Sequence, residues 1–236
     1  MTGRGEVITI FSMRRLRNLI IYTTLICCTM LTIGNERAPA ENRETQARRE
    51  AAPVLMGQLG KPVFIRIIKE DYELELWVQE AEGWRIFKRY EVAGMSGEPG
   101  PKTREGDCQA PEGFYRVVSG ALNPRSSYYL SFNIGYPNRY DRELGRTGSH
   151  IMVHGSNVSI GCFAMTDKGI GEIYTMVAEA LKGGQAYVPV QVYPFRMSEE
   201  RMEEEADNPH LPFWQHLLPG WQHTEKSAEP YPDEDN

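Results

Sequence analysis

Residues 63–92 read VFIRIIKEDYELELWVQEAEGWRIFKRYEV, and they carry the clearest strand pattern in the chain. Its first six residues are mostly apolar and β-branched, and apolar side chains occupy every second position of residues 72–79. Alternation with a period of two is typical of a strand that buries one face. Glu82-Gly83 marks a turn into a further run, residues 84–92. The stretch therefore predicts a β-hairpin at the front of a sheet.

Further short runs predict that the domain is mainly β. An amphipathic helix begins at Thr166-Asp167 and ends at Gly183-Gly184, and we expect it to pack on the sheet. A short surface helix begins at Ser198 and ends before Pro209. The predicted fold class is mainly β, with one packed amphipathic helix and a short C-terminal helical segment; the 22 Gly and 15 Pro agree with many turns. The other predicted strands are 115–118, 128–134, 150–154 and 187–195.

The first forty residues have the pattern of an export signal. Arg14, Arg15 and Arg17 precede an uncharged apolar run, residues 19–33, of the length used by secretory signals. We expect cleavage near Ala40. An uncleaved inner-membrane anchor is the alternative, because the run is only slightly too short to span a bilayer.

Composition divides the rest of the chain into a central domain and polar flanks. Basic and acidic residues balance at 19 each in residues 41–198, whereas residues 199–236 hold 2 basic and 11 acidic residues. This charge distribution offers no basic surface for DNA or RNA, so nucleic-acid binding is not expected. The predicted segments are a signal peptide or anchor (1–40), a linker (41–57) whose first part is either unstructured or a frayed helix, the domain (58–196), a helical cover (197–223) and a disordered acidic tail (224–236).

Candidate chemistry concentrates in residues 149–162, which read SHIMVHGSNVSIGC. If residues 150–154 form a strand, His150 and His154 point to one face, and His154 can face a cleft. A cysteine thiol is mostly protonated at neutral pH, and a neighbouring histidine that takes its proton makes it a nucleophile. The sequence therefore predicts a nucleophile, Cys162, and a base, His154, brought together by a short loop.

Two glycines of this loop have predicted roles in its geometry. Gly155 permits a sharp exit from the strand. Gly161 lets the backbone approach a substrate closely, and its amide and that of Cys162 can donate to a developing oxyanion.

Three other interpretations of these residues stay open. Cys162 could be a small buried filler and His154 a satisfied core histidine, since free cysteine is often simply buried. Cys108 and Cys162 are the only cysteines after residue 40, and a disulfide between them would make the chain a non-catalytic binding module. Zinc could be held by His150, His154, Cys162 and Cys108, but their spacing lacks the paired pattern of zinc ligands, so no metal is expected.

The string from His154 to Cys162 resembles the signature of the L,D-transpeptidase catalytic domain family, whose members act on bacterial peptidoglycan through a cysteine and a histidine. Residues 99–115 and Tyr136-Pro137-Asn138 resemble further segments of its Gram-negative branch. The resemblance covers about residues 58–196 and implies a β-sandwich or barrel.

The chain departs from the family pattern at two places. Ile160 stands where many members carry a second histidine, and Phe163-Ala164 where many carry an arginine. Both features resemble a periplasmic subgroup that includes lipoprotein-releasing murein amidases. The resemblance therefore implies a periplasmic enzyme that needs no cofactor.

The resemblance also implies a mechanism. Cys162 attacks the carbonyl of meso-diaminopimelate in a peptidoglycan stem peptide, His154 acts as base and then as acid, and a thioester forms. Ser159 either braces the loop and orients His154 or simply forms a turn. Water or an amine resolves the thioester, and the missing second histidine modestly favours water, as in detachment of a wall-linked outer-membrane lipoprotein. The candidate substrate-binding residues are Lys102, Asp107, Tyr115, Asn138, Arg139 and Arg146.

Overall fold

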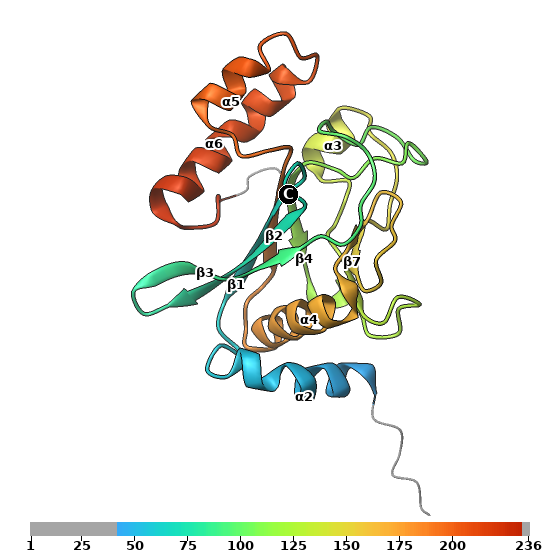
Figure 1. The fold of residues 1–236 in the computed structure, drawn as a ribbon, viewed down its shortest axis with the longest axis vertical. Coiled ribbons are helices and arrows are strands. Elements are labelled where there is room, and N and C mark those ends of the chain that lie inside the picture. The colour runs from blue at the N-terminus through green and yellow to red at the C-terminus, as the bar shows by residue number, and fades with distance from the viewer. Residues whose placement is uncertain (1–41, 233–236) are drawn as a thin grey trace, which may run out of the picture. The chain divides into compact units, whose positions relative to one another are not determined.

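The computed structural model describes residues 42–232, which are built on two β-sheets (Figure 1). The five-stranded sheet has the order β3-β2-β1-β9-β4, and the four-stranded sheet has the order β5-β6-β7-β8. The mainly β fold class predicted from the sequence is thus confirmed. The strands are β1 (Val63–Ile68), β2 (Glu73–Glu80), β3 (Gly83–Glu91), β4 (Gly113–Val117), β5 (Leu122–Asn123), β6 (Ser131–Asn133), β7 (Met152–His154), β8 (Phe163–Ala164) and β9 (Val188–Tyr193).

The predicted hairpin forms the front of the larger sheet. β2 pairs antiparallel with both β1 and β3, and an irregularity in register lies between Leu76 and Trp77. β9 returns late in the chain to lie parallel to β1 and antiparallel to β4. All six residues of β1 are buried, because helices cover both faces of this sheet.

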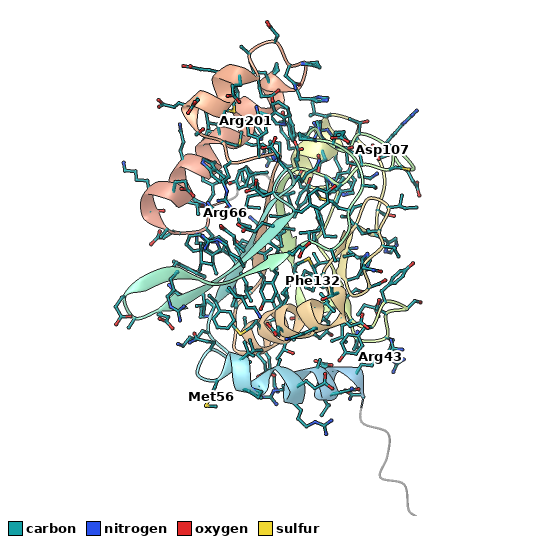
Figure 2. All side chains as sticks on the ribbon, in the orientation of Figure 1. Arg43, Met56, Arg66, Asp107, Phe132 and Arg201 are labelled. Carbon is teal, nitrogen blue, oxygen red and sulfur yellow. The ribbon has the colours of Figure 1, made fainter. Side chains whose placement is uncertain are left out.

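Helix α4 (Thr166–Lys182) fills the space between the two sheets. Ile170, Ile173 and Val177 lie on its buried side, as the helical spacing predicted. Phe132 of β6 packs in the same core, above α4 (Figure 2). This core also supports β7, the strand that ends in His154.

Residues 43–55 differ from the predicted linker, because they form helix α2 (Arg43–Leu55). Ala47, Ala51 and Leu55 are at most 4% exposed and pack into the core shared with α4 (Figure 1). Their spacing of four residues makes a narrow apolar stripe of small side chains. α2 is therefore part of the domain.

A second core lies on the opposite face of the five-stranded sheet, under helices α5 (Glu199–Glu204) and α6 (Leu211–Ser227). Ser198 caps α5, as predicted, by accepting from the Arg201 N–H. Arg66 of β1 faces this side of the sheet, toward α6 (Figure 2). α6 continues beyond the predicted boundary at residue 223, and its Thr224 is 1% exposed, so the residues from 224 to 227 differ from the predicted disordered tail.

The smaller elements position the candidate site. β7 begins at Met152 rather than at residue 150, and His150 lies outside the strand with a φ of 55°. Helix α3 (Arg139–Glu143) and a 3-10 turn (Ser119–Ala121) complete the described elements. None of the helices in residues 42–232 is long and apolar enough to cross a bilayer. The predicted export signal lies outside the described residues.

Candidate active site

Cys162 ends the loop that joins β7 to β8. Because β8 pairs parallel with β7, residues 155–162 return the chain beside the strand that it has just left. The Met152 N–H donates to the Cys162 Sγ at 3.3 Å, and this Sγ lies 3.6 Å from the His150 carbonyl oxygen. The thiol is therefore held against the strand that carries His154.

His154 is the last residue of β7 and is 4% exposed. Its Nδ1 lies 2.6 Å from the Gly155 carbonyl oxygen, which only accepts, so Nδ1 carries the ring proton. Nε2 is then the unprotonated nitrogen of the neutral ring, and it lies 3.4 Å from the Ser159 Oγ. The Tyr128 ring packs on the imidazole, with the centroids 4.8 Å apart, and fixes its plane.

Ser159 links the two predicted catalytic residues. Its Oγ accepts from the Cys162 N–H at 3.1 Å, which leaves the hydroxyl hydrogen to donate to the His154 Nε2. In the described part of the chain no hydrogen bond joins the Cys162 thiol directly to His154. Ser159 therefore orients the imidazole and the nucleophile's backbone together.

The two amides predicted to stabilise an oxyanion both donate to serine hydroxyls. The Gly161 N–H donates to the Ser96 Oγ at 2.7 Å, and the Cys162 N–H donates to Ser159. Gly161 has a φ of +81°, which a residue with a side chain adopts only with strain. Gly161 thus permits the sharp turn that the loop makes just before Cys162.

Gly155 is required for close packing rather than for an unusual dihedral angle. A Cβ there would lie 2.5 Å from the Asp167 Oδ1 and 2.6 Å from the Tyr128 carbonyl oxygen. Asp167 also accepts from the Ser156 N–H at 2.9 Å. The first turn of α4 therefore holds the start of the catalytic loop.

Burial keeps both candidate catalytic groups neutral. It raises the pKa of the Cys162 thiol, although the Met152 N–H, the Lys102 charge and the Ser159 hydroxyl act in the opposite direction. It lowers the pKa of His154, against the hydrogen bond with Gly155. The resting pair is a thiol and an imidazole, so the proton must move when the thiol attacks.

A pocket of about 140 Å³ opens beside the Cys162 thiol. Lys102 contributes its cationic side chain and Glu105 a carboxylate to its wall, while the exposed Ile160 forms part of the rim. The other lining residues are Gly106, Cys108, Gly148, Ser149, His150, Ile151, Gly161 and Cys162. The pocket therefore combines the candidate nucleophile with one buried cation.

Lys102 is fixed in this wall by Asp107. The Lys102 Nζ donates to the Asp107 Oδ1 at 2.6 Å and to the Arg104 carbonyl oxygen at 2.9 Å. Asp107 also accepts from three backbone N–H groups of its own loop. Burial opposes ionisation of Asp107, but these partners hold its pKa at about 2.

The structure does not bring the other predicted substrate-binding residues to this pocket. Tyr115 donates to the Glu112 carbonyl oxygen and to Asp141, and its burial raises its pKa. Asn138 caps α3, Arg146 forms a buried ion pair of 2.8 Å with Asp141, and the exposed Arg139 faces Glu143 at 3.4 Å. Tyr115, Asn138 and Arg146 thus hold α3 and its Asp141 in place, and Arg139 lies on the exposed side of this helix.

Cys108 and Cys162 are both free thiols, so the structure contains no disulfide between them. Both side chains nevertheless line the same pocket, Cys108 from the exposed side. Within residues 42–232 no group of three or more His, Cys, Asp or Glu side chains is placed to hold a metal ion. The residues of the zinc alternative are thus not arranged as ligands.

Two residues of the site were missed from the sequence. Ser96 accepts from Gly161 and donates to the Cys108 carbonyl oxygen at 2.6 Å, so it joins the β3–β4 connection to the β7–β8 loop. Tyr128 covers His154. Neither role has a local sequence signal, because each depends on segments that meet only in the folded chain.

Comparison with known proteins identifies the class. The YkuD family, the L,D-transpeptidase catalytic domain, matches residues 63–192, from β1 to β9. The chain belongs to this family. It is 44% identical over 172 residues, which are 73% of this chain and 70% of the relative, to the Escherichia coli K12 protein named "Putative L,D-transpeptidase YafK". A protein of the same name from Escherichia coli O157:H7 matches to the same extent.

Solved structures also align with the chain. The helical cell shape determining protein Pgp2 of Campylobacter jejuni aligns with a TM-score of 0.47 and 19% identity, over 77% of this chain and 65% of that chain. Bd1075 of Bdellovibrio bacteriovorus aligns with a TM-score of 0.42 and 17% identity, over 71% of this chain and 62% of that chain. The chain thus spans less than two thirds of either solved protein.

Proposed function

We propose that this chain is a periplasmic cysteine enzyme that forms a thioester at the meso-diaminopimelate carbonyl of peptidoglycan stem peptides. The observation that carries the proposal is the link from Cys162 through Ser159 to His154, together with the pocket that Cys162 and Lys102 both line. A nucleophile, a base whose unprotonated nitrogen contacts the Ser159 hydroxyl, and a fixed cation together fit acyl transfer from a substrate that carries a carboxylate.

The first step is attack by Cys162 on the scissile carbonyl. The proton of the thiol passes to the His154 Nε2, either directly or by way of the Ser159 hydroxyl, and the imidazolium is stabilised by its Nδ1–H donating to the Gly155 carbonyl. As the carbonyl oxygen becomes negative, the Gly161 and Cys162 amides exchange their serine partners for it. His154 then gives the proton to the leaving amine.

The predicted substrate-binding residues contribute to binding of the stem peptide rather than to the chemical step. Lys102, held by Asp107, pairs with a carboxylate of the stem peptide. Three other predicted residues act indirectly, by holding α3 and the segments beside it: Tyr115, Asn138 and Arg146. Tyr136, which precedes α3, connects this part of the chain to the pocket wall by donating to the Lys102 carbonyl oxygen at 3.2 Å. Arg139, exposed at the start of α3, is placed to meet a more distant part of the polymer.

Alanine variants of the two central residues test the cysteine mechanism. Cys162→Ala and His154→Ala should each abolish turnover of wall fragments while leaving thermal unfolding near that of the unchanged protein. Cys108→Ala is the matched control, because it removes the other thiol of the same pocket and should have a mild effect. Turnover at the unchanged rate in Cys162→Ala would refute the nucleophile assignment.

Water is the proposed acceptor for the thioester. Ile160, 77% exposed at the pocket rim, replaces the second histidine of many relatives, so the site has one group fewer to position an incoming amine. The enzyme would then be an amidase, for example one that detaches a wall-linked outer-membrane lipoprotein.

The acceptor is tested with a tetrapeptide muropeptide and an excess of diaminopimelate, with the products followed by mass. Hydrolysis products should dominate. Dominant amine-exchange or cross-linked products would overturn the hydrolase assignment and leave the cysteine mechanism intact. The periplasmic location is tested by the N-terminal sequence of the exported protein, which should begin near Glu41; a start at Met1 or Met13 would instead indicate an uncleaved anchor.

A further inference from the structure

Helix α6 lies outside the residues that match the family, yet it makes a buried hydrogen bond to Glu112, which lies within them. Trp214 of α6 is 0% exposed, and its Nε1–H donates to the Glu112 Oε2 at 2.9 Å. Glu112 itself is 1% exposed. A buried carboxylate requires donors on both oxygens, so α6 supplies a partner that the family domain alone lacks at Oε2.

The other oxygen of Glu112 holds one end of residues 98–112, which we call the 98–112 loop. Its Oε1 accepts from the Lys69 Nζ at 2.9 Å and from the Gly100 N–H at 2.6 Å. Glu112 therefore connects the last residue of the loop to the loop's own first turn.

Lys69, in the turn that follows β1, completes this connection. Its buried Nζ also contacts the carbonyl oxygens of Glu98, Gly100 and Ala110, at 2.9–3.0 Å. Burial lowers the pKa of Lys69, and the charge of Glu112 opposes this effect. Both ends of the 98–112 loop are thus joined to one buried cation, and that cation's counterion is held by α6.

The start of α6 also contacts the loop directly. His210, which precedes α6, packs so closely on Gly100 that a Cβ at Gly100 would lie 2.9 Å from the imidazole. The His210 ring in turn packs edge-on against Trp214, with the centroids 5.8 Å apart. The loop, His210 and Trp214 therefore form one packed unit.

Between its held ends, the 98–112 loop carries residues of the pocket wall. Lys102, Glu105, Gly106 and Cys108 all line the pocket beside Cys162. The Ser96 hydroxyl joins the Cys108 carbonyl oxygen to the Gly161 amide, so a shift of the loop also reaches the nucleophile's loop.

We propose that α6 is a positioning element for the active site, with Trp214, acting through Glu112 and Lys69, holding the 98–112 loop and its Lys102 in the substrate-binding geometry. The effect of this element on catalysis rests on the proposed function, whereas its effect on the loop does not. Trp214 is a positioning residue, since it contacts neither the pocket nor Cys162.

The test compares two tryptophan variants of the full chain. Trp214→Phe keeps a buried ring but removes the donor to Glu112. Trp221→Phe is the matched control, because Trp221 lies in the same helix and the same core but contacts Tyr193 and Arg66. His210→Ala is a milder second variant that loosens the same loop if Trp214→Phe fails to fold.

Hydrogen exchange of peptides from the 98–112 loop is measured first. We expect exchange to accelerate about tenfold in Trp214→Phe and measurably in His210→Ala, with β1 and β2 unchanged, and no acceleration in Trp221→Phe.

Turnover is measured second, and we expect KM to rise about threefold to tenfold in Trp214→Phe with a smaller change in kcat. A folded Trp214→Phe protein whose loop exchanges as in Trp221→Phe would overturn the proposal, and so would loop acceleration with KM unchanged in an active enzyme. If the unchanged protein shows no turnover at all, but exchange of the loop still accelerates selectively in Trp214→Phe, the proposed function is refuted and the positioning of the loop stands.

Discussion

The thiol of Cys162 and the imidazole of His154 are kept neutral by the same cause, removal from water. A neutral pair makes the thiol a weak nucleophile until a substrate arrives. It also keeps the base in the form that accepts a proton. The acid limb of the pH profile therefore reports the burial of His154.

We expect turnover to persist below the ordinary histidine pKa of about 6.5. Because burial lowers the pKa of His154, the ring stays neutral as the pH falls through that value, and activity is lost only at lower pH. The pH dependence of kcat/KM measures this limb. Tyr128→Leu removes the ring that covers His154, so its limb should move toward the ordinary value. A limb at or above 6.5 in the unchanged protein would contradict this explanation.

Ser96 should support turnover through the Gly161 amide. Ser96→Ala removes the hydroxyl that fixes this N–H and the Cys108 carbonyl. We expect kcat/KM to fall about threefold to tenfold and the free energy of unfolding to fall by about 1 kcal/mol. The exposed Ser119 of the 3-10 turn offers the control, since Ser119→Ala should change neither quantity measurably. Equal kinetics in the two variants would exclude a role for Ser96.

The local sequence pattern predicted that Cys162 and His154 lie near each other, and Ser159 contacts both in the structure. The surroundings of this pair were predicted less well. A cysteine after Gly161 and a histidine before Gly155 are close in the chain, so a local pattern contains them. The predicted binding residues Tyr115, Asn138 and Arg146 have the right charge or polarity, but contacts with Asp141 and α3 engage them. Such contacts depend on the tertiary arrangement.

Helix α2 illustrates the same limit at the scale of an element. Its segment is rich in charge, and its apolar stripe consists mainly of alanines, so the sequence favoured a linker. Small side chains allow α2 to approach α4 closely, and the Ala47 Cβ would lie 3.6 Å from a Cβ at Gly171. Close approach of two helices, rather than large apolar residues, attaches α2 to the domain.

Charge placed on the buried side of α2 should therefore destabilise the domain far more than charge placed on its exposed side. Ala51→Glu puts a carboxylate at a position that is 4% exposed, and we expect it to lower the free energy of unfolding by about 2–4 kcal/mol. Ala52→Glu makes the same change one residue later on the exposed side and should cost less than about 0.5 kcal/mol. Urea unfolding measures both values. Similar midpoints for the two variants would mean that α2 does not contribute to the folded domain.

At the scale of the whole molecule, the five-stranded sheet separates two cores, one with α4 and α2 and one with α6 (Figure 1). The hairpin and α4 were predictable because their periodicities are strong and local. A helical cover was predicted for residues 197–223, but the full length of α6 was not, because Pro219 and Gly220 resemble helix breakers inside a helix that continues to Ser227. Gly220 instead permits close packing, since a Cβ there would lie 2.5 Å from the Phe114 ring.

The end of the chain should be necessary for the stability of the second core. Arg66 is 2% exposed, lies between the rings of Trp77 and Trp221, and pairs with Glu75 at 2.7 Å and with Glu225 at 2.6 Å. Deleting residues 224–236 removes Glu225, the buried Thr224 and the Tyr231 ring that packs on Phe114.

We expect this deletion to lower the free energy of unfolding by about 2–4 kcal/mol, because it opens a core and takes one partner from a buried cation. Glu225→Gln is the control that isolates the ion pair. Because Glu225 is half exposed and Arg66 keeps Glu75, this single change should cost only about 1 kcal/mol or less. Urea denaturation followed by tryptophan fluorescence measures both proteins. A truncated chain that unfolds at the same urea concentration as the full chain would show that residues 224–236 are a dispensable tail.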